Sequence, residues 1–514
     1  MKKVIFGAAA LLFTGALMAQ TLNLPAQSDL KAKDGTNSMD ANEVSHLGSN
    51  PTIFGGNTGE AIQNGNTNKV QVRQAGTNQS AYSIQSDGLG TGDNRARIWQ
   101  TGAVLSDSGY RNVADVRQQG TGNQASAYQE GDTNEAVVRQ GMKDGGLSTG
   151  NKAYINHGTG EQGETNYAMV EQDGLNNTSK TVQQYDNSEA RTVQLGDDNM
   201  ADIRQDAGPN QSAGHSALAE QYGNENATRI RQYGSAKNTA HSMQNGDRNK
   251  VNQTQTSNAA SGIGNNAVVD QGYGLVPFSA SASAIWGSTS SVDNIQNGTF
   301  NGSSDDAKAL QIQDGSENDA LIGQFGDGSG IGNVAEQRQD GDRNGAVIGQ
   351  NAYGSTTGGD NYARQDQTGD DNMAGIGQNG SDHLAYQRQI GNSNEAYSTQ
   401  RGSDNHVSTY QGGDGNILET GQRGQNNTIL LVQKQEAGFA GHSFKVSQNL
   451  PGGSPVGMPN GGNIADVLQL GPSGNFATDG EGCDFQDATD LDMPGGVGSF
   501  DIANPCADGT GTGC

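Results

Sequence analysis

Glutamine and asparagine recur in this chain at a fixed interval, and their side-chain amides are its most repeated chemical group. A carboxamide has an acceptor oxygen and two N–H donors, so identical amides in register can hydrogen-bond to one another. Between residues 378 and 433 a glutamine stands at every eleventh position, usually with an asparagine six residues before it and a glycine two residues after it. The predicted ladder residues are Asn372, Gln378, Gly380, Gln389, Gly391, Asn394, Gln400, Gly402, Asn405, Gln411, Asn416, Gln422, Gly424, Asn427 and Gln433, and, from earlier copies, Asn112, Gln118, Asn123, Gln129, Asn134 and Gln140.

The spacing inside one unit predicts a β-strand. In the pattern N-x-A-x-V-x-Q the recurring residues alternate with variable ones. Side chains of a strand alternate between its two faces, so Asn, Ala, Val or Ile, and Gln all lie on one face. The residues that link the units are rich in Gly, Asp and Asn, which tolerate the positive φ of tight turns. No unit has apolar residues at helical spacing, so the pattern excludes helix.

Two such half-repeats, each of 11 residues, make a rung of strand, turn, strand and turn, about 22 residues long. Rungs stacked ~4.7–4.9 Å apart would pair every backbone amide with the rungs on either side. Ala and Val would form a dry seam between the two sheets. We therefore predict an all-β, amyloid-like β-solenoid over residues 57–475, of ~16–18 rungs at this spacing, with an irregular insertion near residues 275–301.

Average composition alone would indicate disorder. Only 31% of the residues are hydrophobic, 78 are glycine, and the net charge is −26, which is typical of chains that cannot bury enough apolar surface to fold. The repeats change this interpretation, because amides stacked in register can replace a large apolar core. We interpret the polar inner face as structural and not as a binding site.

Acidic turns and isolated histidines are the candidate ligand groups. Stacked carboxylates in turns such as 196–199 and 369–372 could bind Ca²⁺ weakly through oxygen ligands. The favoured interpretation is that like charges keep the chain soluble until export. His157 stands at a glutamine place and His383 at an asparagine place, so both are predicted to interrupt the ladders rather than to bind metal. We expect no metal and no cofactor.

Arginines occupy several outward strand positions, for example Arg73 and Arg231. Stacked arginines would suit a polyanionic polymer, whereas an ordinary solvated face is the simpler interpretation. The net negative charge argues against nucleic acid as a partner.

Catalytic motifs are missing from the sequence. It contains no G-x-S-x-G, H-E-x-x-H or Walker-type loop. Its Gly-x-Gly stretches lie in turns without a following helix, unlike nucleotide-binding loops. We predict that the protein is not an enzyme.

The two ends of the chain lack the repeat. Residues 1–19 are predicted to be a secretory signal, since Lys2 and Lys3 precede an apolar run too short to span a bilayer. Residues 20–56 form an irregular leader, and residues 476–514 an acidic tail rich in Gly and Pro. In an oxidising compartment two of the tail cysteines could pair, as Cys483–Cys506 or Cys506–Cys514. Whether the leader or the tail covers an open edge of the solenoid stays undecided.

In these residues the chain resembles curlin-repeat proteins, in particular the major subunit of curli, a bacterial functional amyloid. The curlin pattern runs S-x5-Q-x-G-x-x-N-x5-Q. Asn394, Gln400, Gly402, Asn405 and Gln411 occupy its five marked places, with Asn in place of the first Ser.

The resemblance implies a secreted structural subunit of curli-like extracellular amyloid fibres. Such a subunit self-assembles by templated stacking of rungs and serves cell adhesion and the biofilm matrix as a pilus-like surface fibre. The implied partners are further copies of the chain, a curli-type secretion pore and a nucleator, with the outer-membrane surface reached only through them. The alternative is a monomeric β-solenoid adhesin or surface-binding protein.

Overall fold

The computed structural model consists of β-strands and the turns between them, and no helix occurs in the part of the chain that it describes. The predicted all-β solenoid is confirmed. None of the described residues forms a helix long and apolar enough to cross a membrane. The described residues are 57–87, 91–101, 111–142, 148–158, 163–208, 213–272, 304–326, 332–351, 359–435, 441–448 and 461–471.

Several predicted features lie outside these residues. They are the signal segment 1–19, the leader 20–56, the insertion near 275–301, and the tail 476–514 with Cys483, Cys506 and Cys514.

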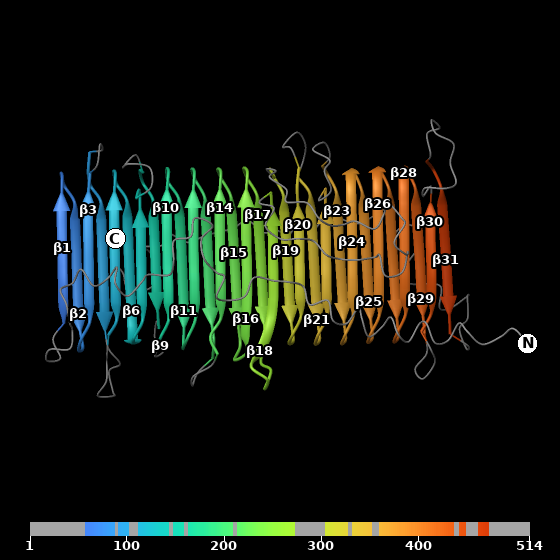
Figure 1. Ribbon diagram of the computed structural model, residues 1–514, viewed down its shortest axis with the longest axis horizontal. Helices are drawn as coiled ribbons and strands as arrows, with labels where there is room; N and C mark the ends of the chain where they lie inside the picture. Colours follow the sequence, from blue (N-terminus) through green and yellow to red (C-terminus); the bar gives the residue numbers. More distant parts are fainter. Residues whose placement is uncertain are drawn as a thin grey trace, which may run out of the picture. The chain divides into compact units, whose positions relative to one another are not determined.

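The strands fall into two compact units. In the first unit, strands of two layers alternate along the chain (Figure 1). Layer 1 contains β1 (Thr58–Asn64), β3 (Ser80–Ser86), β5 (Val113–Gln119), β7 (Glu135–Gln140), β10 (Tyr167–Asp173), β12 (Glu189–Leu195), β14 (Ser216–Tyr222) and β16 (Lys237–Asn245). Layer 2 contains β2 (Lys69–Ala75), β4 (Arg95–Thr101), β6 (Gln124–Asp132), β8 (Lys152–His157), β11 (Thr178–Gln184), β13 (Met200–Asp206), β15 (Ala227–Tyr233) and β17 (Lys250–Thr256), and the short β9 (Gly163–Glu164) pairs with the end of β6.

The second unit has the same alternation. Its layer 1 contains β20 (Asp319–Gln324), β22 (Gly345–Gln350), β24 (Met373–Ser381), β26 (Glu395–Ser403), β28 (Ile417–Gln425) and β30 (Ser443–Gln448). Its layer 2 contains β21 (Val334–Asp340), β23 (Tyr362–Thr368), β25 (Leu384–Ile390), β27 (His406–Gly412), β29 (Thr428–Lys434) and β31 (Ile464–Leu470). Strands β18 (Ile263–Gln271) and β19 (Lys308–Asp314) have residues in both units.

Each strand pairs in parallel with the next strand of its own layer, and the register places equivalent residues side by side. Gln378 lies opposite Gln400, which lies opposite Gln422. Insertions between rungs leave this register intact, since Ser80 still pairs with Val113, and Thr428 with Ile464. The described rungs are fewer than the predicted number, because these insertions take up residues that a strict repeat would have placed in strands.

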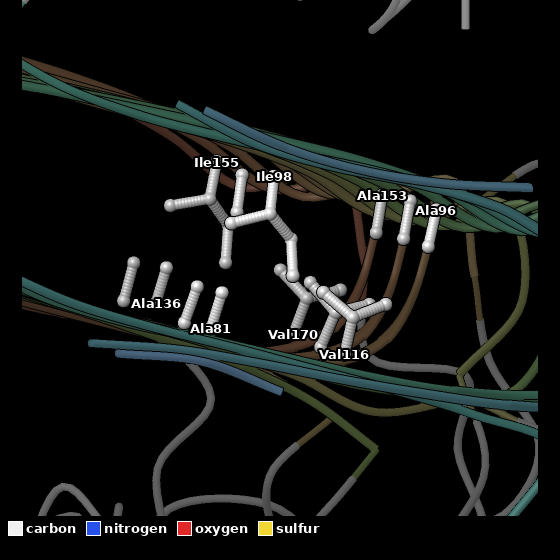
Figure 2. Packing of buried hydrophobic residues seen from close by; sticks show 13 residues of the cluster. Ala81, Ala96, Ile98, Val116, Ala136, Ala153, Ile155 and Val170 are labelled. Carbon is white, nitrogen blue, oxygen red and sulfur yellow. The ribbon is translucent and has the colours of Figure 1, made fainter. Parts of the chain in front are cut away.

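The core lies between the two layers. In the first unit, Ala and Val or Ile side chains from both layers meet there, and Figure 2 shows Ile98 and Ile155 directed toward the layer that carries Val116 and Val170. All four side chains are fully buried. The alternation of apolar and variable residues therefore forms a narrow apolar seam, as the period of two predicts.

The turns depend on glycine. Gly380 and Gly402 have φ values of 127° and 119°. A Cβ added to Gly402 would come within 2.0 Å of the carbonyl oxygen of Gly424 in the next rung. Glycine is needed here both for its backbone conformation and because stacked turns approach so closely.

Candidate functional site

The repeat glutamines of the second unit form continuous side-chain hydrogen-bond ladders. In layer 1, the Nε2 of Gln378 donates to the Oε1 of Gln400, and Gln400 to Gln422, both at 3.0 Å. In layer 2, Gln389 donates to Gln411 at 2.9 Å and Gln411 to Gln433 at 3.0 Å. These six side chains are at most 2% exposed. Ladders of this kind satisfy buried amides that would otherwise destabilise the fold.

Each glutamine also bonds across the seam. The Nε2 of Gln400 donates to the backbone carbonyl of Leu384 in the opposite layer at 3.0 Å, and that of Gln411 to the carbonyl of Glu395 at 2.9 Å. One amide therefore ties two rungs and two layers together.

The first unit repeats this geometry. In layer 1, Gln85 donates to Gln118 and Gln118 to Gln140, both at 2.8 Å. In layer 2, Gln100 donates to Gln129 at 2.9 Å. In both units the Nε2 donor lies on the earlier rung and the Oε1 acceptor on the later one, so each ladder has a direction.

The repeat asparagines bond differently from the glutamines. The backbone N–H of Asn394 donates to the Oδ1 of Asn372 at 3.1 Å, and the Nδ2 of Asn394 donates to the carbonyl of Gly413 at 2.7 Å. In the first unit the N–H of Asn134 likewise donates to Asn112 Oδ1 at 3.0 Å. Asparagine thus fixes the start of a strand to a neighbouring turn. The equivalent backbone bonds are those of Asn123 to Asn94, Asn405 to His383, Asn416 to Asn394 and Asn427 to Asn405.

Comparison with protein families gives this repeat a name. A family model described as the curlin associated repeat matches residues 109–141 and 196–234. This is a curlin-repeat protein. No curated protein matches the chain. The two matched segments contain β5 to β7 and β13 to β15, and the regular rungs at 378–433 carry the same ladders outside them. Both the curlin repeat and the β-solenoid are features of structural proteins.

The two predicted histidine substitutions have different outcomes in this curlin-repeat protein. His383 takes over the role of asparagine, because its Nδ1 accepts the N–H of Asn405 at 3.3 Å and its Nε2 lies 3.2 Å from the carbonyl of Asn379. Since a carbonyl can only accept, Nε2 carries the proton. Burial lowers the pKa of His383 to about 4, so the ring stays neutral.

His157 interrupts the glutamine ladder of layer 2. Its ring is completely buried, and neither ring nitrogen has a hydrogen-bond partner among the described residues. The Oε1 of Gln183 on the next rung has none there either. Burial lowers the pKa of His157 to about 3. Among the described residues of the first unit, the layer 2 row is therefore interrupted at His157.

The acidic turns hold a further row of hydrogen bonds that sequence reasoning missed. The Oδ1 of Asp370 accepts the N–H of Asp342 at 2.9 Å, and the N–H of Asp370 donates to Asn392 Oδ1 at 2.8 Å. Within the described stretches, no group of three or more His, Cys, Asp or Glu side chains is placed to hold a metal ion. A recurring Asp or Asn directly after the turn glycine is the sequence signal for this row.

A second glutamine row was also missed. In layer 2 of the second unit, Gln337 donates to Gln365 and Gln365 to Gln387, both at 3.0 Å. These residues occupy the place that Val or Ile takes in other strands. The signal was the sequence Q-x-Q in three successive strands of one layer, β21, β23 and β25.

The first and last described rungs carry opposite ends of the ladders. At β1 and β2, Gln63 and Gln74 donate to later rungs, and no hydrogen bond within the described stretches reaches their Oε1 atoms. At β30 and β31, Gln448 and Gln469 accept from earlier rungs at 3.1 and 2.7 Å. The first rung therefore offers amide acceptors, and the last rung offers amide donors.

Proposed function

We propose that this curlin-repeat protein is a secreted structural subunit that polymerises head to tail into curli-like extracellular amyloid fibres for cell adhesion and biofilm matrix. The single observation that carries the proposal is the complementarity of the two end rungs. An open edge strand is a template for pairing with another chain. A contact between different ends of identical molecules does not close on itself and therefore propagates.

The proposed contact continues the ladders from one copy into the next. The Nε2 groups of Gln448 and Gln469 would donate to the Oε1 atoms of Gln63 and Gln74 of another copy. The Oδ1 of Asn463 would accept the N–H of Asn68, as Asn68 Oδ1 accepts that of Asn94 at 3.0 Å within the chain. Edge exposure supports an accessible contact, since most residues of β1 and β2 are exposed and Ile464 is 71% exposed.

Export and assembly would follow the curli pattern. The signal-like residues 1–19 support secretion, and the curlin repeat supports an extracellular, cell-surface location. The proposed partners are other copies of the chain, a curli-type secretion pore and a nucleator. Nucleic acid is not among them, and contact with the outer-membrane surface would be indirect.

The test is assembly of the purified mature chain, residues 20–514. Thioflavin fluorescence, electron microscopy and fibre diffraction should reveal fibres with a cross-β reflection at about 4.8 Å along the axis. A folded chain that stays monodisperse would overturn the proposal and favour the monomeric adhesin.

A matched pair of variants on β2 tests the proposed contact itself. In Gln74→Lys the ammonium group can still donate to the carbonyl of Thr58, as Gln74 does at 2.9 Å, but it cannot accept a bond from Gln469 of another copy. We expect elongation from preformed seeds to slow by about tenfold, the effect of roughly 1.4 kcal/mol. Gln71→Lys adds the same charge at an exposed position of the same strand and should elongate at close to the normal rate. Equal slowing in both variants would show that charge, and not the ladder, controls growth.

A further inference from the structure

Layer 2 of the first unit turns a cationic face outward. The buried residues of its strands alternate with more exposed ones, as in β4, β11 and β17. Among the outward residues Glu130, Asp132, Asp202 and Asp206 are acidic, as is Glu164 of the short β9. Ten are basic, and we call the surface that they form the basic face: Lys69, Arg73, Arg95, Arg97, Lys152, Lys180, Arg204, Arg229, Arg231 and Lys250.

The other outward surfaces do not share this charge. In layer 1 of the first unit, four cations stand against seven anions: Arg117, Arg139, Arg191 and Lys237 against Glu60, Asp115, Glu135, Glu171, Asp173, Glu189 and Glu220. In β21 to β31 of layer 2 in the second unit, four cations stand against four anions: Arg338, Arg364, Arg388 and Lys434 against Glu336, Asp340, Asp366 and Asp466. In a chain of net charge −26, one layer of one unit gathers a third of the 30 Lys and Arg residues.

Aromatic rings lie within the basic face. Trp99 and Tyr128 occupy the same position on neighbouring strands, with ring centroids 5.8 Å apart. The guanidinium carbons of Arg73 and Arg97 lie 5.3 and 5.2 Å from the centre of the Trp99 ring, so cation–π contacts hold the two cations over the ring. Farther along the stack the ammonium of Lys180 lies 6.0 Å from the ring of Tyr154. Rigid aromatic surface and oriented cations thus occur together.

The positive charges are close enough to influence one another. Burial lowers the pKa of Lys180, and the neighbouring Arg231 and Arg204 lower it further, whereas Asp202 acts in the opposite direction. Like charges crowded on one surface destabilise each other, and a bound polyanion would relieve that repulsion. Strand pairing repeats the outward side chains about every 4.7–4.9 Å along the layer, so the cations form rows and not a single cluster.

We propose that the basic face binds an acidic polysaccharide, a linear chain of sugars that carry carboxylates, laid along the stack of strands. Arginine pairs with carboxylates in a planar, two-bond geometry. The half-buried Trp99 and Tyr128 offer apolar ring surface against which the C–H faces of sugars can pack. The proposal concerns a ligand, and it does not depend on fibre formation.

The flat geometry of the basic face disfavours duplex nucleic acid. A flat sheet face does not enter the grooves of a duplex, where sequence and shape are read.

Binding of the monomeric mature chain to polygalacturonate, measured by titration calorimetry, tests the proposal. The matched probe is the methyl-esterified form of the same polymer, which keeps the sugars and removes the charge. We expect binding to the free acid, a decrease in affinity as salt is raised, and at least about tenfold weaker binding to the ester. Equal binding to both polymers, or tighter binding to duplex DNA than to polygalacturonate, would overturn the proposal.

Two double variants locate the site. Arg73→Gln with Arg97→Gln removes two cations from the basic face and should weaken binding by about tenfold. Arg388→Gln with Lys434→Gln removes two outward cations from layer 2 of the second unit and should leave affinity unchanged. All four side chains point away from the seam, and circular dichroism checks that both variants fold. An equal loss of affinity in both variants would mean that total charge, and not the basic face, determines binding.

Discussion

The same strand position is filled in two different ways in the two units. In the first unit, an apolar block runs through β3 to β10, where Ile98, Val116 and Ile155 pack between the layers. In the second unit, a double-glutamine block occupies β21, β23 and β25, where Gln337, Gln365 and Gln387 bond to one another at the equivalent position. One backbone thus accommodates either dispersion contacts or a second amide ladder as its core.

The two blocks differ in how they tolerate interruption. The apolar block contains His157, which breaks the neighbouring glutamine ladder, yet its register is maintained on both sides of the break. In the double-glutamine block, the last amide of the row finds another acceptor, because Gln387 donates to the Oγ of Ser398 at 2.9 Å. Apolar contacts are not directional, so a missing ladder partner does not disturb them. An amide core requires a partner for every group.

The largest effect should follow from placing a charge in the double-glutamine block. Gln365→Glu replaces an N–H donor by a carboxylate between Gln337 and Gln387, with no cation to compensate it. We expect the free energy of unfolding to fall by about 3–5 kcal/mol, as for other uncompensated buried charges. Urea unfolding followed by circular dichroism measures the change.

The control for that variant is Gln71→Glu, the same substitution on an exposed position of β2. It should alter stability by less than about 0.5 kcal/mol. If Gln365→Glu is as mild as this control, the second ladder does not stabilise the rungs.

A somewhat smaller loss of stability than that of Gln365→Glu is expected from a substitution in the apolar block. Ile155 is fully buried, and Ile155→Ala should lower the free energy of unfolding by about 3 kcal/mol through lost transfer energy and a residual cavity. Ile155→Val should cost about 1 kcal/mol. Urea unfolding of the two variants checks the gradation. Equal losses would show that strand propensity, rather than packing, determines stability at this position.

Sequence alone predicted the fold better than the surface. The period of two placed Ala and Val on one inner face, and the structure confirms the solenoid with Ala81 and Ile98 between its layers. The bonding of each amide could not be predicted, because a period identifies a face but does not identify the donor. Thus the bond of the Asn394 backbone to Asn372 and the row through Asp370 emerged only from the structure.

The basic face could not be recognised from the sequence for a related reason. Its cations extend from Lys69 to Lys250 and are separated in the sequence by the acidic residues of layer 1, such as Glu135 and Glu189. They become one surface only when alternate strands are assigned to alternate layers. The arginines were visible in the sequence, but their segregation from the acidic residues was not.

Acid should weaken the apolar block at His157. Its pKa is about 3 in the folded state and about 6.5 when unfolded. The unfolded chain therefore binds more protons between these values, and stability is lost as pH falls. The loss attributable to His157 should be about 2 kcal/mol at pH 5 relative to pH 8. Urea unfolding of the wild type and of His157→Gln at both pH values isolates it.

The wild type has to be compared with His157→Gln because other titrating groups change the stability in the opposite direction as pH falls. Burial, and then Asp115, raise the pKa of Glu135 to about 7. The folded chain therefore retains a proton there, and this site gains stability as pH falls through 7. The Glu135 contribution is common to the wild type and the variant and cancels. If His157→Gln has the same pH dependence as the wild type, His157 is not the acid-sensitive group.

The smallest expected effect is a gain in stability from closing the gap at neutral or higher pH. In His157→Gln, the new amide can accept from the Nε2 of Gln129 and donate to the unpaired Oε1 of Gln183. At pH 8 this should stabilise the chain by about 1 kcal/mol, measured by urea unfolding.

The matched substitution His383→Gln should instead destabilise the chain, because His383 already bonds to Asn405 and Asn379. A gain in both variants would indicate that glutamine is simply favoured in any strand. A gain only at His157 would show that the apolar block tolerates a broken ladder but is still stabilised by a complete one.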